Sequence, residues 1–109
     1  MRTLKFIVDG QIIKQDPNCD FSGLVPGSER YLRAEFSFSN AWRGCAKAAE
    51  FYSYMGKEYE PQLIKDDACI IPAEALKRQI FKIRLVGRNQ SGIKLRTNKV
   101  SVHQNGGKA

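Results

Sequence analysis

The sequence predicts an all-β fold: an antiparallel β-sandwich or barrel with roughly eight short strands and one brief helix. Three observations support this. Apolar and polar residues alternate along most segments, turn-forming residues separate these segments at short intervals, and only one segment carries helical signals. With 109 residues, 42% of them apolar and 27% charged, the chain suits one modest core. We therefore expect a single sandwich domain over residues 1–104 and a flexible tail over residues 105–109.

The first half of the chain predicts three strands. Residues 3–8 alternate regularly, and an Asp-Gly turn leads to a second strand at residues 11–14, so the two should form a hairpin. Residues 15–29 carry Pro, Gly and acidic residues without a period, which indicates a long surface connection. Residues 31–38 give the clearest strand pattern, and a turn containing the only tryptophan follows them. We expect Phe36 and Trp42 to anchor the core.

The second half predicts more strands and the helix. Strands are expected at residues 48–54, 58–64 and 68–71, joined by turns. Residues 72–78 begin with Pro, carry an acid early and cations late, and so predict a helix of about two turns. The last strands are expected at residues 79–86, at 93–96 with Ile93 and Leu95 facing inward, and around Val100 and Val102. A bulge or break near residues 97–98 would bring these apolar positions into one core.

Charge is distributed very unevenly. Residues 1–75 carry nine Lys or Arg and eleven Asp or Glu, whereas residues 76–109 carry nine Lys or Arg and no acid, so the net charge of +7 comes from the last third. Such a field is relieved by an anionic partner. The candidate partner-binding residues form a basic face on the last strands: Lys82, Arg84, Arg88, Lys94, Arg96 and Lys99.

The register expected for the last hairpin places Leu85 opposite Ile93, so that Arg84 lies opposite Lys94 and Lys82 opposite Arg96. Like charges that face each other across a ladder destabilise it. Three interpretations remain: a solvated face that guards the sheet edge, a contact for an acidic protein surface, or a nucleic-acid site. The last is the least favoured, because nucleic-acid-binding sheets use stacking aromatics and this outer face is expected to have none.

No residue pattern indicates catalysis, a cofactor or a metal. Cys19, Cys45 and Cys69 are widely spaced and predict free thiols, and His103 is the only histidine. The pair Asp66-Asp67 lies between two strands and predicts a turn. Residues 87–92 have the glycine spacing of a phosphate-binding loop but lack its Lys-Ser/Thr end, so they predict a hairpin loop whose glycines supply positive φ angles. No segment predicts a secretory signal or a membrane span.

The order of these segments resembles a domain found in phage and prophage structural proteins. The resemblance covers residues 3–102 and rests on five segments: residues 4–11, residues 31–38 followed by Trp42, residues 48–51, residues 69–72 before the short helix, and residues 97–102. In that family the domain lies at the N-terminus of tail and baseplate upper proteins of phages of Gram-positive hosts, and in small head or tail accessory proteins.

The resemblance implies an immunoglobulin-like β-sandwich without enzymatic activity. It implies a protein that docks on a virion in many symmetric copies, as a head decoration, tail or baseplate component. The missing secretory signal predicts synthesis in the host cytoplasm, and the basic face predicts docking against phage proteins with acidic surfaces. Two alternatives remain open: a small phage-encoded inhibitor of a host defence or replication protein, and a basic nucleic-acid-binding β-domain. No membrane partner is expected.

Overall fold

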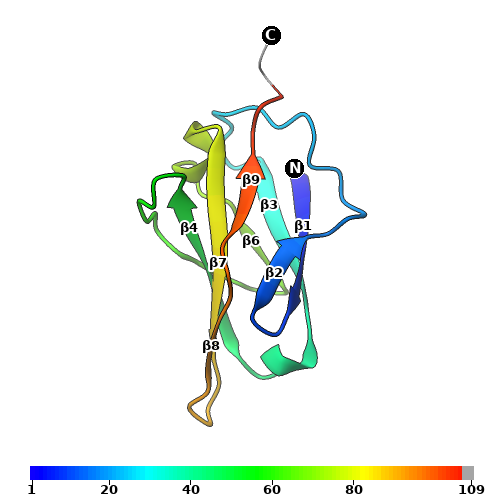
Figure 1. Cartoon of the computed structure of the whole chain (residues 1–109), viewed down its shortest axis with the longest axis vertical. Helices are drawn as coiled ribbons and strands as arrows, with labels where there is room; N and C mark the ends of the chain where they lie inside the picture. Colours follow the sequence, from blue (N-terminus) through cyan, green and yellow to red (C-terminus); the bar gives the residue numbers. More distant parts are fainter. Residues whose placement is uncertain (107–109) are drawn as a thin grey trace.

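The chain folds into a sandwich of two β-sheets, and the computed structural model describes residues 1–106 (Figure 1). Sheet A has the strand order β2-β1-β3-β6, and sheet B has the order β5-β4-β7, with β8 and β9 both pairing with the far side of β7. The predicted all-β sandwich is therefore confirmed. The strand bounds are β1 Arg2–Asp9, β2 Ile12–Gln15, β3 Leu32–Phe38, β4 Ala46–Ser53, β5 Gln62–Leu63, β6 Ala68–Ile70, β7 Ile80–Arg88, β8 Lys94–Arg96 and β9 Val100–His103.

Strand pairing is antiparallel except between β1 and β3, which run parallel in the register Phe6 to Phe36. A parallel neighbour requires a long crossover. The connection between β2 and β3 supplies it by passing over one end of the sandwich (Figure 1). This pair differs from the fully antiparallel arrangement that we expected, and the immunoglobulin-like topology stays a prediction.

The core forms between the sheets from the apolar faces that alternation predicted. Phe36 is 2% exposed and stacks on Phe6 with ring centroids 5.7 Å apart. Trp42 is fully buried, and its Nε1 donates a hydrogen bond of 2.7 Å to the carbonyl of Gly10. Both predicted core anchors are thus confirmed. Trp42 ends a short 3₁₀ turn, η1 (Asn40–Trp42), which lies within the predicted turn.

The predicted two-turn helix at residues 72–78 is wrong in type and length. The structure has only the 3₁₀ turn η2 (Ala75–Lys77), closed by hydrogen bonds from Ala75 N to the Pro72 carbonyl and from Leu76 N to the Ala73 carbonyl. A segment this short cannot offset the cost of helix nucleation. Its conformation is set by packing, because Ala75 and Leu76 are fully buried.

The strand predicted at residues 58–64 is reduced to the two-residue β5. Pro61 precedes β5 and has no N–H to donate to a ladder. Further toward the N-terminus only an isolated bridge forms, between Glu58 and Tyr52 of β4. Sheet B therefore has a very short strand at this edge.

The break predicted near residues 97–98 is confirmed. Thr97 is 5% exposed, its N donates to the Leu85 carbonyl and its Oγ1 accepts from Leu85 N. The side chain replaces one backbone partner, so β8 and β9 can both pair with β7. Val102 is buried, whereas Ile93, predicted to face inward, is 53% exposed.

The predicted register of the last hairpin is wrong. Val86 pairs with Arg96 and Arg88 with Lys94, so Arg84 does not face Lys94 and Lys82 faces Ser101 of β9. The hairpin closes later than expected because Asn89 organises a tight turn: its Oδ1 accepts from Ser91 N and Ile93 N.

The three cysteines are free thiols, as predicted; Cys45 and Cys69 are buried and Cys19 is partly exposed. Burial raises the pKa of Cys69 to about 12. The tail predicted at residues 105–109 lies partly outside the described residues. Of its described part, Gly106 donates a hydrogen bond to the Leu24 carbonyl.

Candidate functional site

The outer face of sheet B is organised in cross-strand rows, because directly opposed residues of antiparallel strands point to the same face. Each row takes one residue from β4 and one from β7, and most rows add one from β8 or β9. In order along the strands, the rows are Tyr52, Lys82 and Ser101; Glu50 and Arg84; Leu63 (from β5), Ala48, Val86 and Arg96; and Ala46, Arg88 and Lys94.

Glu50, Tyr52 and Arg84 form a hydrogen-bonded network in the middle of this face. Arg84 Nε lies 3.1 Å from Glu50 Oε1, and its Nη2 donates to the Tyr52 hydroxyl at 2.7 Å. The Tyr52 hydroxyl in turn donates to Glu50 Oε1 at 2.8 Å. The Arg84 and Glu50 side chains are only 23% and 19% exposed, so the charge of Arg84 is largely neutralised within the protein.

Two lysines extend this network by lying over tyrosine rings. Lys99 Nζ is 3.9 Å from the centroid of the Tyr52 ring, and Lys82 Nζ is 5.3 Å from that of Tyr54. Both distances suit cation–π attraction. Burial, and then the hydrogen bond to Glu50, raise the pKa of Tyr52 to about 12. We call Glu50, Tyr52, Lys82, Arg84 and Lys99 the paired centre.

A second group of cations lies at the β7–β8 hairpin. Arg88, Lys94 and Arg96 are all exposed, and Arg88 directly faces Lys94. Among residues 1–106, the ion pairs involve only Arg33, Lys77 and Arg84 on the basic side, so these three cations are not neutralised within the described chain. In Figure 1 the hairpin extends past the neighbouring strands, which makes its cations accessible.

An apolar depression of about 230 Å³ adjoins these cations. Ala46, Ala48, Leu63 and Val86 contribute to its lining, together with Arg88. Leu63 is 80% exposed, although large aliphatic side chains are usually buried. We call Arg88, Lys94, Arg96 and this depression the cationic end.

The cationic end is supported from below by close packing. A Cβ on Gly87 would lie 2.6 Å from Trp42 Cζ3, so only glycine allows the strand to lie directly on the indole. Gly87 therefore serves packing, in contrast to the positive φ expected for it, whereas Gly92 does have a φ of +88°. Near the same end, the side chain of Asn98 bonds to the N–H and carbonyl of Ile13 in β2, which ties the β8–β9 connection to sheet A.

The structure separates the six predicted basic residues into two groups. Lys82, Arg84 and Lys99 belong to the paired centre, and Arg88, Lys94 and Arg96 gather at the cationic end. The expectation that the outer face has no aromatic residue is wrong, because β4 and the residue after it bring Tyr52 and Tyr54 beside Lys82. Tyr52 and Tyr54 follow Ala48 and Glu50 at intervals of two residues, so alternation along the strand could have placed both tyrosines on this face.

Within residues 1–106, no group of three or more His, Cys, Asp or Glu side chains is placed to hold a metal ion. No helix in that range is both long and apolar enough to cross a bilayer. Comparison with family models, curated proteins and solved structures gave no significant match.

Proposed function

We propose that this protein is a non-enzymatic docking domain whose cationic end binds an acidic protein surface. The observation that carries the proposal is the combination of three unneutralised cations, two of them directly opposed, with an adjoining apolar depression. An acidic partner with a small apolar contact relieves the repulsion between Arg88 and Lys94 and covers Leu63 at the same time. The paired centre has no comparable need for a partner.

We further propose that the docking takes place on a phage particle, as a head decoration, tail or baseplate component present in many copies, with an immunoglobulin-like sandwich as the docking unit. The support is the resemblance of residues 3–102 to the phage structural domain, together with a β-sandwich whose core uses the segments that carry this resemblance. A protein that is repeated around a symmetric particle needs only one such contact per copy.

Mass spectrometry of purified particles from the host strain that carries this gene tests the virion part of the proposal. We expect the protein in the particles at a fixed ratio to the other structural proteins. Its absence from purified particles would contradict a virion role and favour an inhibitor that remains in the host cytoplasm.

Charge reversal tests the docking surface. Particles should incorporate the protein with Arg88→Glu and Arg96→Glu poorly, because reversed charges repel an acidic partner. The matched control, Lys5→Glu with Lys14→Glu, changes the charge equally at exposed positions of sheet A and should be incorporated normally. Equal incorporation of both variants would make the cationic end a solvated surface, and tight duplex-DNA binding with a steep salt dependence would favour nucleic acid instead.

A further inference from the structure

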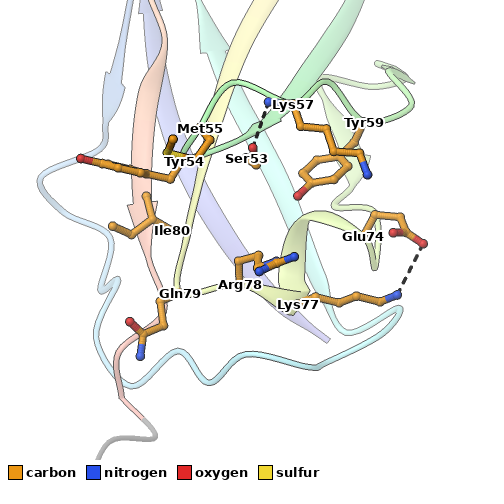
Figure 2. A pocket seen from close by; sticks show the side chains of 10 residues that line it. All are labelled: Ser53, Tyr54, Met55, Lys57, Tyr59, Glu74, Lys77, Arg78, Gln79 and Ile80. Carbon is orange, nitrogen blue, oxygen red and sulfur yellow. Dashed lines mark hydrogen bonds and ion pairs between the residues drawn. The ribbon is translucent and has the colours of Figure 1, made fainter.

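A larger hollow lies at the opposite end of sheet B, where β4 ends and β7 begins. Its volume is about 610 Å³, within the range typical of ligand-binding pockets. One wall is the turn after β4 that carries Tyr54 and Met55, and the other is the segment from Glu74 to Ile80 (Figure 2). The paired centre reaches this hollow only through Lys82, which lies over the Tyr54 ring, and the hollow shares no lining residue with the cationic end.

Apolar side chains and charges occupy different sides of the hollow. In Figure 2, Tyr54, Met55 and Ile80 gather on one side, Lys57 and Tyr59 lie on the other, and Arg78 stands between them. Met55 is 88% exposed and Tyr54 is 62% exposed, so two large apolar side chains stand in solvent at the rim. Exposed methionine and tyrosine are typical of protein-binding surfaces, because they adapt to a partner at low cost.

The charges around the hollow select an anionic occupant. The charged lining residues of the hollow are three cations, Lys57, Lys77 and Arg78, and one carboxylate, Glu74. Glu74 Oε1 lies 3.7 Å from Lys77 Nζ. Both members of that pair are more than 60% exposed, so solvent screens the contact and it neutralises little of the positive field. The hollow therefore combines an apolar side with a net positive side.

Both walls are held by internal hydrogen bonds. In the turn, Ser53 N donates to the Lys57 carbonyl at 2.8 Å, and Lys57 N donates to Ser53 Oγ at 2.9 Å. In the other wall, the buried Gln104 side chain donates to the carbonyls of Leu76 and Arg78 at 3.1 and 2.9 Å. A site that is already ordered loses little entropy when it binds.

We propose that this hollow binds an acidic peptide segment of a partner protein, with one aromatic or large aliphatic side chain placed against Tyr54, Met55 and Ile80. The acidic residues of that segment lie against Lys57 and Arg78. Because Tyr54 and Met55 line the hollow and are still largely exposed, the contact surface suits a chain that continues past it better than a small molecule. The hollow and the cationic end lie at opposite ends of β7, roughly 25 Å apart at about 3.3 Å per residue, so one domain can join two partners.

The test is binding of a fluorescein-labelled heptapeptide with three glutamates on each side of a central phenylalanine, followed by fluorescence anisotropy. Lys57→Glu with Arg78→Glu should weaken binding by about ten-fold or more, since attraction becomes repulsion. Tyr54→Ser with Met55→Ser keeps the charges and should weaken binding by a similar factor, through loss of the apolar contact. Replacing the phenylalanine of the peptide by alanine should have the same effect.

Lys5→Glu with Lys14→Glu is the matched control, because it makes the same change of charge at two exposed positions of sheet A. It should leave peptide affinity within about two-fold, and amide chemical-shift changes should map to residues 53–59 and 74–80. No detectable binding to the wild type, or an equal loss in the control, would overturn the proposal. The proposal would also be overturned if a labelled single-stranded oligonucleotide bound more tightly than the peptide. A wild-type dimer in sedimentation that dissociates in Lys57→Glu with Arg78→Glu would overturn it as well. Arg88→Glu with Lys94→Glu distinguishes the two proposals, because a peptide bound at the cationic end would be lost in this variant and kept in Lys57→Glu with Arg78→Glu.

Discussion

The paired centre and the cationic end occupy the same face of the same sheet, yet their cations have different environments. In the paired centre, Arg84 bonds to Glu50 and Tyr52, and the two lysines lie over tyrosine rings. At the cationic end, Arg88 faces Lys94 and no acid of the described chain balances them. The number of cations on a face therefore does not indicate how many are available to a partner.

Packing beneath the cationic end provides the largest test of this comparison. If the packing of Gly87 on Trp42 supports the strand that carries the exposed cations, removing the indole should lower the free energy of unfolding far more than any surface substitution does. Trp42→Ala should lower the free energy of unfolding by about 3–5 kcal/mol, because it leaves a large cavity and an unpaired Gly10 carbonyl. Gly87→Ala should lower it by about 1–3 kcal/mol through overlap with the indole.

Urea denaturation of both single mutants and the double mutant checks this prediction. The effect of Gly87→Ala should shrink in the Trp42→Ala background, since the overlapping atoms are gone. Additive effects would mean that Gly87 and Trp42 do not interact as described.

The next test concerns the single acid that distinguishes the two regions. Glu50→Gln should lower the free energy of unfolding by about 1–2 kcal/mol, because it leaves the partly buried Arg84 without its counter-charge. The control Glu60→Gln changes an exposed acid outside the network and should have an effect within about 0.5 kcal/mol. Urea denaturation measures both effects. Equal free energies of unfolding for the two variants would show that Glu50 stabilises the protein no more than an ordinary exposed acid.

The fold was largely predictable from alternation, because a half-buried strand imposes a period of two on its sequence. Residues 3–8 and 31–38 became β1 and β3 almost as expected, and Phe36 and Trp42 became core anchors. Elements fixed by distant contacts were not predictable. The 3₁₀ turn η2 depends on burial of Leu76, and the parallel pairing of β1 with β3 depends on the path of a long loop.

The site was less predictable than the fold. Charge counts identified the basic residues, but their grouping depends on strand register, and the tight turn at Asn89 changes that register. A register error exchanges every cross-strand neighbour at once. The residue that pairs with Arg84 is therefore Glu50 of β4. Strand β4 borders β7 on the side opposite β8, the hairpin strand that the sequence placed against Arg84.

The pH dependence of stability offers a sharper probe of the paired centre. The pKa of Tyr52 is raised from 10.0 to about 12 in the folded protein, so the folded state holds the proton more tightly than the unfolded state. This contribution to stability is fully present below pH 10 and is lost as the pH rises from 10 to 12. The stability advantage of the wild type over Tyr52→Phe should therefore shrink across that window, as measured by urea denaturation at each pH. Tyr54→Phe should follow the wild type, and parallel curves for wild type and Tyr52→Phe would contradict the network.

The smallest expected effect is at the cationic end, where removing a charge should stabilise the protein. Lys94→Gln should raise the free energy of unfolding slightly, because it ends the direct opposition of Lys94 and Arg88. Added salt should stabilise the wild type by screening the same repulsion, and it should stabilise Lys94→Gln less. Urea denaturation with and without sodium chloride measures both effects without adding a charged denaturant.

Lys82→Gln is the matched control in the paired centre, and it should not raise the free energy of unfolding, because Lys82 lies over the Tyr54 ring. If Lys94→Gln instead destabilised the domain, Lys94 would have a stabilising partner within the protein, and the contrast between the two regions would be lost.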